Sequence, residues 1–297
     1  MELWIPVTIA AAFLQNARSA LQKHLRSRLD TVGAAYVRFV YAVPFTLVWV
    51  ATLLVVGGHP LPLPDSTFLV FAGIAGLSQI LATLFLVALF SLRTFAAGTA
   101  YSKTETVQAA IIGLLILGDP LSVGALAGIV VSLVGVLVLS IARTTAGARE
   151  LSGRAIPFGL ASGALFALTA VSVRAASLSL GGDGFLMQAA FTLLVVTAWQ
   201  TVIMTAWLFA RRRQVLAEAF GSWRVSGLVG LTGMMASACW FTAMTIENAA
   251  YVRALGQVEL VFTFIASRVI FREHSSIAEF MGILAIVAGI LVLVLGR

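Results

Sequence analysis

Apolar residues along the chain gather into ten long runs, which short polar or turn-forming segments separate. A membrane-spanning helix needs about 20 mostly apolar residues, whereas a strand of a membrane barrel has about ten residues of alternating polarity. A helix also satisfies its own backbone hydrogen bonds in lipid. The pattern therefore predicts an all-α membrane protein with ten transmembrane helices. They are expected at residues 3–22, 32–56, 67–92, 95–117, 121–142, 153–178, 184–210, 222–246, 249–271 and 276–296.

The composition argues against a water-soluble protein. Hydrophobic residues make up 60% of the 297 residues, and charged residues only 10%. A soluble domain has about 25% charged residues, and one of this length could not bury so much apolar surface. The net charge of +7 would favour nucleic acid as the partner of a soluble chain. Here the basic residues lie in short clusters between apolar runs, so we expect a lipid bilayer and no nucleic acid.

The basic residues predict how the helices are oriented. They concentrate in alternate connections, whereas the opposite connections hold mainly acidic residues. Cytoplasmic loops carry the excess of Lys and Arg, so the basic connections are expected in the cytoplasm and both termini outside. An even number of spans is needed for that arrangement. The basic residues in question are Lys23, Arg26, Arg28, Arg93, Arg143, Arg149, Arg154, Arg211, Arg212, Arg213, Arg224, Arg268 and Arg272.

The second half of the chain echoes the first when it is shifted by 154 residues. Matching by composition alone is the competing explanation, but the shared positions include a glutamate and two glycine spacings. An odd number of helices forces the two halves to insert in opposite orientations, as in many secondary transporters. We predict two inverted five-helix repeats, residues 1–145 and 146–297, in one integral membrane unit. The matched pairs include Gly73 and Gly227, Gly76 and Gly230, Glu105 and Glu259, Gly128 and Gly282, and Gly135 and Gly289.

Small residues line one face of the last helix in each predicted half. Such faces let membrane helices approach closely, so these helices are expected to form packing seams and not substrate contacts. The residues are Gly124, Gly128, Ser132 and Gly135 in the first half, and Ala278, Gly282 and Gly289 in the second.

These features resemble the EamA-type members of the drug/metabolite transporter superfamily. The similar segments are Leu-Gly-Asp-Pro-Leu-Ser before Gly128, Phe-Arg-Glu-His-Ser-Ser before Gly282, residues 15–23, Arg38 and Pro44. The resemblance covers the whole chain and implies ten helices, a bacterial inner membrane and export of amino acids or related metabolites through a central cavity. Within that family, we expect similarity to the aromatic amino-acid exporter. Many members keep both termini in the cytoplasm, whereas the loop charges here favour the opposite orientation.

Polar residues inside the predicted helices are the candidates for a substrate site. A charged side chain at the bilayer centre costs at least about 2.5–3.5 kcal/mol, so it must face the bundle interior, pair or reach an interface. Amide and hydroxyl groups can hold the ammonium and carboxylate of an amino acid, and aromatic rings can receive its side chain. The expected substrate-binding residues are Asn16, Gln79, Tyr101, Glu105, Phe166, Trp240, Tyr251, Gln257 and Glu259.

A structural role for the same charges is the alternative. Glu105 and Glu259 could pair with Lys103, Arg18 or Arg253 and merely neutralise charge. Lys103 is otherwise expected to reach toward an interface, and Arg253 to be structural. A glutamate without such a partner could instead bind a proton and couple proton movement to transport.

We expect a transporter and not an enzyme. The sequence has no nucleophile elbow, no metal-ligand spacing, no phosphate-binding loop and no cofactor motif. The expected mechanism is alternating access by a monomer around a small-molecule substrate, with protons as a possible second partner. A proton-coupled exporter of cationic drugs and a membrane channel remain as alternatives. The expected hinge residues are Pro44, Gly73, Gly76, Gly163, Gly227 and Gly230.

Overall fold

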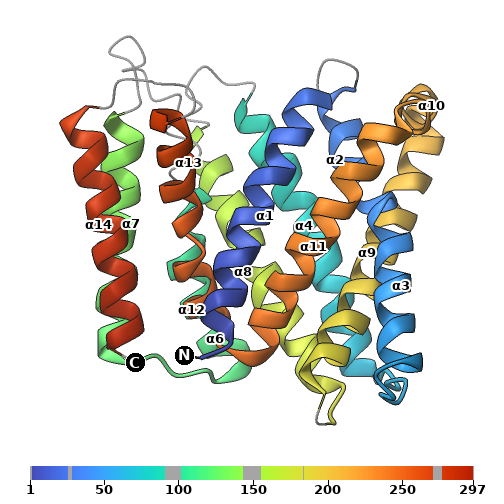
Figure 1. Ribbon diagram of the computed structural model, residues 1–297, viewed down its shortest axis with the longest axis horizontal. Helices are drawn as coiled ribbons and strands as arrows, with labels where there is room; N and C mark the ends of the chain where they lie inside the picture. The colour runs from blue at the N-terminus through green and yellow to red at the C-terminus, as the bar shows by residue number, and fades with distance from the viewer. Residues whose placement is uncertain are drawn as a thin grey trace. The chain divides into compact units, whose positions relative to one another are not determined.

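The computed structural model describes residues 2–25, 29–90, 102–142, 155–182, 184–269 and 276–296, and every regular element within these ranges is a helix (Figure 1). Seven of the described helical segments are long and apolar enough to cross a membrane. They are Val32–Val55, Ser66–Leu86, Val123–Ala142, Pro157–Ser179, Phe185–Arg211, Trp223–Ile246 and Ile277–Leu295.

The other three predicted spans correspond to less regular parts of the described chain. Helix α1 (Trp4–Leu25) has the length of a span, but its second half carries several polar residues. Helix α6 (Glu105–Leu117) covers the second half of the span predicted at 95–117, whose first residues lie outside the described ranges. The span predicted at 249–271 is divided into α12 (Ala249–Leu255) and α13 (Val258–Val269). The count of ten spans therefore stays a prediction.

The chain forms two compact units. Unit 1 contains Met1–Leu77 and Ser172–Ile246, and unit 2 contains Ser78–Val171 and Glu247–Arg297. Each unit combines segments from both predicted halves. The predicted division between residues 145 and 146 concerns repeats along the sequence, whereas the two units are defined by compactness in space. The predicted division therefore stays a prediction.

Unit 1 is built around α11 (Trp223–Ile246), which packs against α1 and against α9 (Phe185–Arg211). Helix α9 also contacts α2 (Thr31–Val40) and α3 (Ala42–Val55). Hydroxyl groups inside this apolar unit bond to the backbone of their own helix, as Thr8 does to the carbonyl of Trp4. Such bonds satisfy a buried hydroxyl without a second helix.

Helices α2 and α3 are separated at Tyr41, three residues before Pro44. Proline has no N–H and its ring crowds the carbonyl four residues earlier, so a continuous helix is interrupted at this point. Pro44 was expected to act as a hinge, and that role stays a prediction.

Two helices run through the boundary between the units. Helix α4 (Ser66–Phe90) and helix α8 (Ala155–Ser179) each contribute residues to both. Within unit 2 the two helices are joined by hydrogen bonds from the Ser162 hydroxyl to the Ala82 carbonyl, at 3.0 Å, and between the hydroxyls of Ser78 and Thr169, at 2.9 Å.

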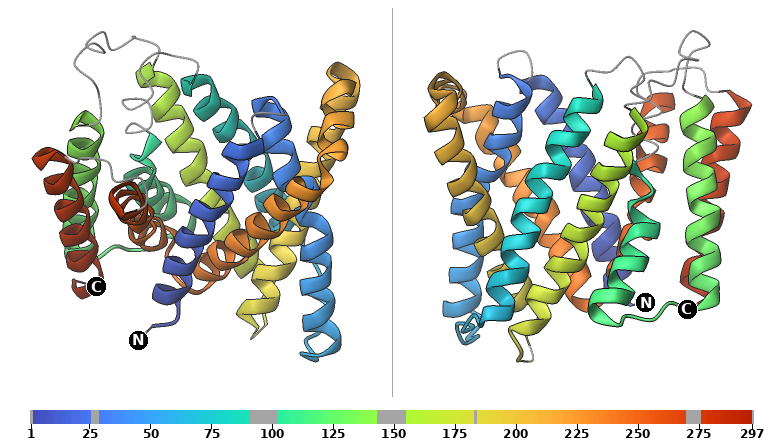
Figure 2. Two further views of the ribbon diagram at one scale, coloured as in Figure 1. Left: turned by 45° about the horizontal axis from the view of Figure 1, so that its top comes forward. Right: turned by 180° about the vertical axis from the view of Figure 1, so that it is seen from behind.

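Unit 2 contains a close pair of antiparallel helices, α7 (Val123–Ala142) and α14 (Ile277–Leu295) (Figures 1 and 2). A Cβ atom at Gly128 would lie 2.5 Å from the Leu293 nitrogen, and one at Gly135 would lie 2.6 Å from the Ile286 nitrogen. The glycines therefore allow backbone-to-backbone contact, which confirms the predicted packing seam. Inverted halves require their equivalent helices to run in opposite directions, as this pair does.

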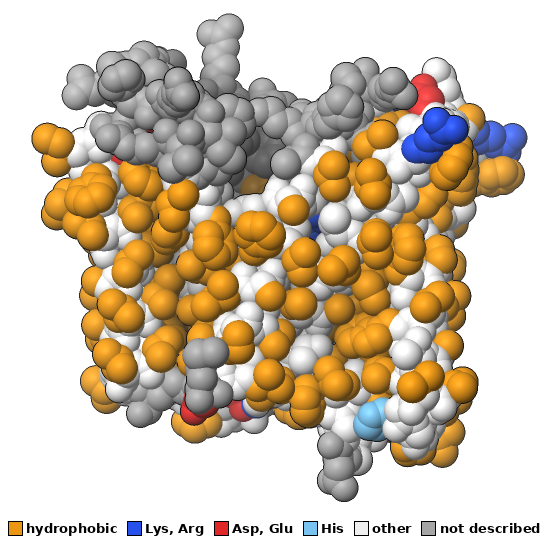
Figure 3. Space-filling view, in the orientation of Figure 1, with side chains coloured by type: hydrophobic (Ala, Val, Ile, Leu, Met, Phe, Trp, Pro, Cys, Tyr) orange, Lys and Arg blue, Asp and Glu red, His pale blue; other side chains and the backbone are white. Residues whose placement is uncertain are grey.

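Apolar side chains cover the outer faces of these helices (Figure 3). On α14 the exposed large apolar residues are Ile277, Phe280, Met281, Leu284, Val287, Leu291, Val292 and Leu295. An exposed apolar surface of this kind is unfavourable in water and suits contact with lipid chains.

The seam generates a first prediction. Substitution of Gly128→Ala should lower the free energy of unfolding by about 1–3 kcal/mol, because an added methyl group overpacks the α7–α14 contact. Gly73→Ala is the matched control, since a Cβ there meets no atom within 4 Å. It should be neutral or stabilising by up to about 1 kcal/mol. Thermal unfolding of the two detergent-solubilised variants measures the difference, and equal losses would show that the seam is not tightly packed.

Candidate functional site: two ion pairs beside an interrupted helix

Two turns in the described part of unit 2 lie within one residue of equivalence under the 154-residue shift. One is the turn at Gly256 and Gln257, between α12 and α13, and the other is the turn at Lys103 and Thr104, before α6. Each turn is followed within two residues by a glutamate. Inside a membrane, non-helical backbone is tolerated where protein buries it or where it lines a water-filled cavity. These turns are therefore the first candidates for a functional site.

The turn between α12 and α13 is held by tight backbone bonds. The Gln257 N–H bonds the Ala254 carbonyl at 3.1 Å, and the Glu259 N–H bonds the Gly256 carbonyl at 3.1 Å. Bonds of this spacing, three residues apart, tighten the helix and rotate the side chains that follow. The rotation decides which face of α13 carries Glu259.

An ion pair joins α6 to α12. The guanidinium of Arg253 donates from Nη2 to Oε2 of Glu105 at 2.6 Å. The two side chains are 15% and 10% exposed. A charge-assisted bond of this length is among the stronger polar contacts in proteins.

A second ion pair joins the turn before α6 to α13. The ammonium of Lys103 donates to Oε1 of Glu259, and these side chains are 22% and 13% exposed. Lys103 also interacts electrostatically with Glu105 and Arg253. We refer to these four residues as the charge quartet, which has two positive and two negative groups. The expectation that Lys103 reaches toward an interface stays a prediction, and Glu259 lies within its reach. The alternative in which the two glutamates pair with basic residues is confirmed.

Gln257 fixes the turn to two neighbouring helices. Its Oε1 accepts a hydrogen bond from the Ser132 hydroxyl on α7 at 2.6 Å, and its Nε2 donates to the Thr106 hydroxyl on α6 at 3.2 Å. The side chain is almost fully buried. Gln257 therefore ties the turn beside the charge quartet to α6 and α7.

A close approach of α8 supports the turn before α6. A Cβ atom at Gly163 would lie 2.9 Å from both the Ser102 carbonyl oxygen and Oε1 of Gln108. Only a glycine fits at this distance, so close packing accounts for Gly163. Its expected role as a hinge stays a prediction.

The structure brings together Glu105, Gln257 and Glu259 among the predicted substrate-binding residues. Tyr251 lies on α12 as well, and its hydroxyl accepts a hydrogen bond from the Ser122 N–H at 3.3 Å. Gln79 on α4 and Phe166 on α8 are partly buried in unit 2. Tyr101 lies outside the described residues.

The remaining predicted residues belong to unit 1. Asn16 is partly buried on α1, and the buried Trp240 donates from its indole nitrogen to Oε1 of Gln15 at 3.1 Å. Helix α1 and helix α11 are thereby joined. A single cavity lined by all nine predicted residues stays a prediction.

Four of the predicted hinge glycines form two pairs under the 154-residue shift, and the space around the two members of each pair is similar. A Cβ at Gly73 or Gly227 would meet nothing within 4 Å. By contrast, one at Gly76 would lie 2.9 Å from the Trp199 ring, and one at Gly230 would lie 2.6 Å from the Tyr41 carbonyl carbon. Matched glycines therefore have matched surroundings, which favours the predicted repeat.

Sequence reasoning named Lys103, Arg18 and Arg253 as possible partners of the two glutamates but did not assign which cation pairs with which carboxylate. The paired residues lie about 150 positions apart along the chain, so no local spacing could identify the pairs. The matched glutamates at a shift of 154 residues were the available signal, because each buried carboxylate requires a cation nearby.

The charge quartet generates a second prediction. Arg253→Gln or Glu105→Gln alone should each lower the free energy of unfolding by about 3–5 kcal/mol, because the remaining charge is buried without its partner. The double variant should lose less than the sum of the two. Arg212→Gln is the matched control, since the Arg212–Asp30 pair is exposed and has a similar length of 2.7 Å; its loss should be about 0–1 kcal/mol. Additive losses at 105 and 253, measured by thermal unfolding, would contradict direct pairing.

Comparison with known proteins agrees with this architecture. A chain of a solved structure titled "Crystal structure of protein" is 16% identical, aligns over 99% of this chain and 98% of its own length, and has a TM-score of 0.71. At this identity the likeness shows the fold alone. A search of curated proteins found no match. The sequence model of the EamA-like transporter family matches residues 2–141 and 153–295. These two segments cover almost the whole chain, which therefore belongs to the EamA-like transporter family.

Proposed function

We propose that this membrane transporter of small molecules exports amino acids, including aromatic or apolar ones, by alternating access in a bacterial inner membrane. It would act as a monomer and without covalent chemistry. The observation that carries the proposal is the charge quartet, in which largely buried groups of both signs, 10–22% exposed, lie beside an interrupted helix.

A zwitterion is the ligand that the quartet suits best. The carboxylate of an amino acid can pair with Arg253 or Lys103, and its ammonium with Glu105 or Glu259. Each protein charge then exchanges one partner for another, so that none is left buried alone. That exchange matters because an unpaired buried charge costs several kcal/mol. A neutral solute could not replace the pairs that it separates.

Export of cationic drugs is less compatible with the same site. A monocation bound at the quartet would be attracted by the two glutamates. It would also be repelled by Lys103 and Arg253, which lie beside those glutamates. Proton coupling through either glutamate also loses support, because each carboxylate already has a basic partner.

The interrupted helices supply a means of movement. Broken helices near the substrate are common in secondary transporters, where one part of the helix moves while the other stays packed. Here α12 and α13 are separated at the quartet, and α2 and α3 are separated at Tyr41. A channel needs a continuous path, whereas buried ion pairs at a helix break favour a site that opens and closes.

Counterflow in proteoliposomes tests the proposed function. Proteoliposomes that contain unlabelled phenylalanine should transiently accumulate labelled phenylalanine or leucine from the outside medium. The initial rate should saturate with the outside concentration. Arg253→Gln should reduce the rate about tenfold or more, because loss of one partner of a buried charged bond costs about 2 kcal/mol or more. In phosphatidylcholine vesicles, which offer no anionic headgroup, Arg212→Gln should transport as the unaltered protein does because its ion pair is exposed. Non-saturable flux would indicate a channel, and transport of a quaternary ammonium compound in place of amino acids would indicate a drug exporter.

A further prediction concerns coupling. Phenylalanine uptake should have the same rate with and without an imposed pH gradient, since both quartet glutamates already pair with cations. The measurement uses valinomycin and potassium to hold the membrane potential constant. A rate that rises with an inward or outward proton gradient would contradict this assignment and would restore a proton-coupled mechanism.

A further inference from the structure

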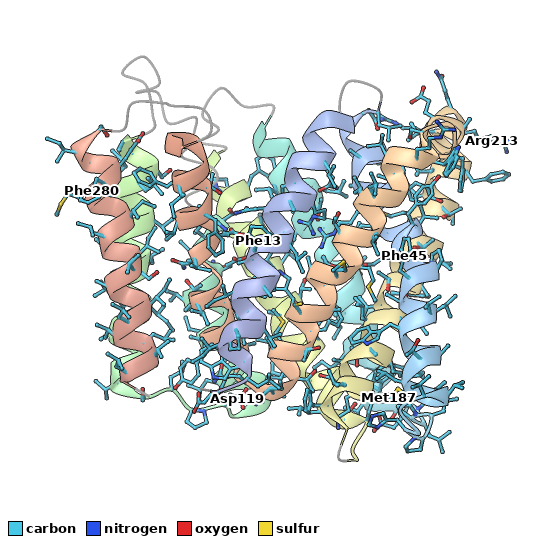
Figure 4. All side chains as sticks on the ribbon, in the orientation of Figure 1. Phe13, Phe45, Asp119, Met187, Arg213 and Phe280 are labelled. Carbon is cyan, nitrogen blue, oxygen red and sulfur yellow. The ribbon has the colours of Figure 1, made fainter. Side chains whose placement is uncertain are left out.

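Arginine and exposed aromatic side chains gather at one end of unit 1, where α9 ends and α11 begins. The short helix α10 (Arg213–Gly221) connects the two. Figure 3 shows basic side chains beside apolar ones at this end, and Figure 4 marks Arg213 there. We define the basic patch by its four cations and three aromatic residues: Arg211, Arg212, Arg213, Arg224, Phe209, Phe220 and Trp223.

Helix α10 lies with one face on unit 1 and the other facing outward. Its buried residues are Val215 and Ala219, which are four positions apart and so share one face. Val215 packs near Gly33 of α2, and the Ala219 carbonyl accepts a hydrogen bond from the Tyr41 hydroxyl at 3.3 Å. The outward face is therefore held in a fixed position.

The exposed groups of the patch are oriented before any ligand arrives. The Arg213 guanidinium lies 4.3 Å from the centre of the Phe209 ring, and its Nε donates to the Phe209 carbonyl at 2.9 Å. The Arg224 guanidinium lies 5.5 Å from the Trp223 ring. Arginines held in this way lose less conformational entropy when they bind an anion.

The aromatic residues are much more exposed than their size would favour in water. Phe209, Phe220 and Trp223 are 57%, 53% and 60% exposed. Aromatic side chains with arginines beside them are typical of the boundary between acyl chains and headgroups. This surface therefore combines exposed aromatic rings with cationic groups, as the boundary between acyl chains and phosphates requires.

The charge of the patch selects the headgroup. Two acidic residues lie in this region, and both have partners: Asp30 accepts from Arg212 at 2.7 Å, and Glu218 accepts from Gln214 at 3.0 Å. The four arginines of the patch outnumber these two carboxylates, so the region has a net positive charge. We propose that the basic patch binds the phosphate headgroup of an anionic phospholipid, with the exposed aromatic rings against its acyl chains.

Binding at the patch would stabilise an interrupted part of unit 1. Tyr41, at the break between α2 and α3, contacts the Ala219 carbonyl and the Phe220 ring on α10 and also packs on Gly230 of α11. A lipid that holds α10 in place therefore supports three helices through one side chain. Because the lipid would bind this site only in the folded protein, its binding should raise the free energy of unfolding.

Thermal unfolding in nanodiscs tests the proposal. Replacing phosphatidylcholine by a mixture with phosphatidylglycerol should raise the melting temperature of the unaltered protein by about 2–4 °C. The variant R211Q/R213Q should lose most of that rise, whereas R211K/R213K, which keeps both charges, should retain most of it. Inorganic phosphate added to phosphatidylcholine nanodiscs should have no effect, because it offers no acyl chains to the aromatic rings.

Three results would overturn the proposal. The first is an equal rise in melting temperature with phosphatidylglycerol for the unaltered protein and R211Q/R213Q. The second is that R211K/R213K loses as much of that rise as R211Q/R213Q does. The third is a rise in melting temperature when inorganic phosphate alone is added. If R211Q/R213Q melts lower in phosphatidylcholine as well, native mass spectrometry can count the phosphatidylglycerol molecules that each protein retains. Unchanged retention by R211Q/R213Q would then reject the site.

Discussion

A charge inside a membrane protein must pair, bond to backbone carbonyls, or reach a cavity or an interface, and pairing of charges organises unit 2. Glu105 and Glu259 each pair with a cation that is distant in sequence. The pairs draw α6, α12, α13 and the turn before α6 to one place. Because removal of either partner would leave a buried charge alone, the four residues are best understood as one group.

The helix interruptions and the ion pairs depend on each other. A tight turn at Gly256 and Gln257 leaves polar backbone inside an apolar unit, which lipid would not tolerate. The Gln257 side chain bonds to Ser132 and Thr106 and so fixes the turn between two helices. Irregular backbone, buried amide and paired charges thereby occur together, as expected where a solute is to be bound and released.

Close packing supplies the rigid part of the same unit. The glycines of α7 and α14 bring the two backbones into contact, and α7 also carries the Ser132 that holds Gln257. In lipid, where burial of apolar surface provides little driving force between helices, such contacts stabilise association. One helix therefore serves both the seam and the site. Unit 1 uses different means, with α10 and Tyr41 supporting the break between α2 and α3.

The sequence by itself determined the membrane setting, the helical class and the glycine seam, because these follow from hydrophobic length and from the spacing of small residues along one helix. The interruption near Pro44 was also predictable, since proline removes a backbone donor locally. The partners of Glu105 and Glu259 were decided only by the tertiary structure, as was the place of Lys103 in the quartet. Pairing of charges about 150 residues apart depends on how helices cross, and no pattern within a single helix records that.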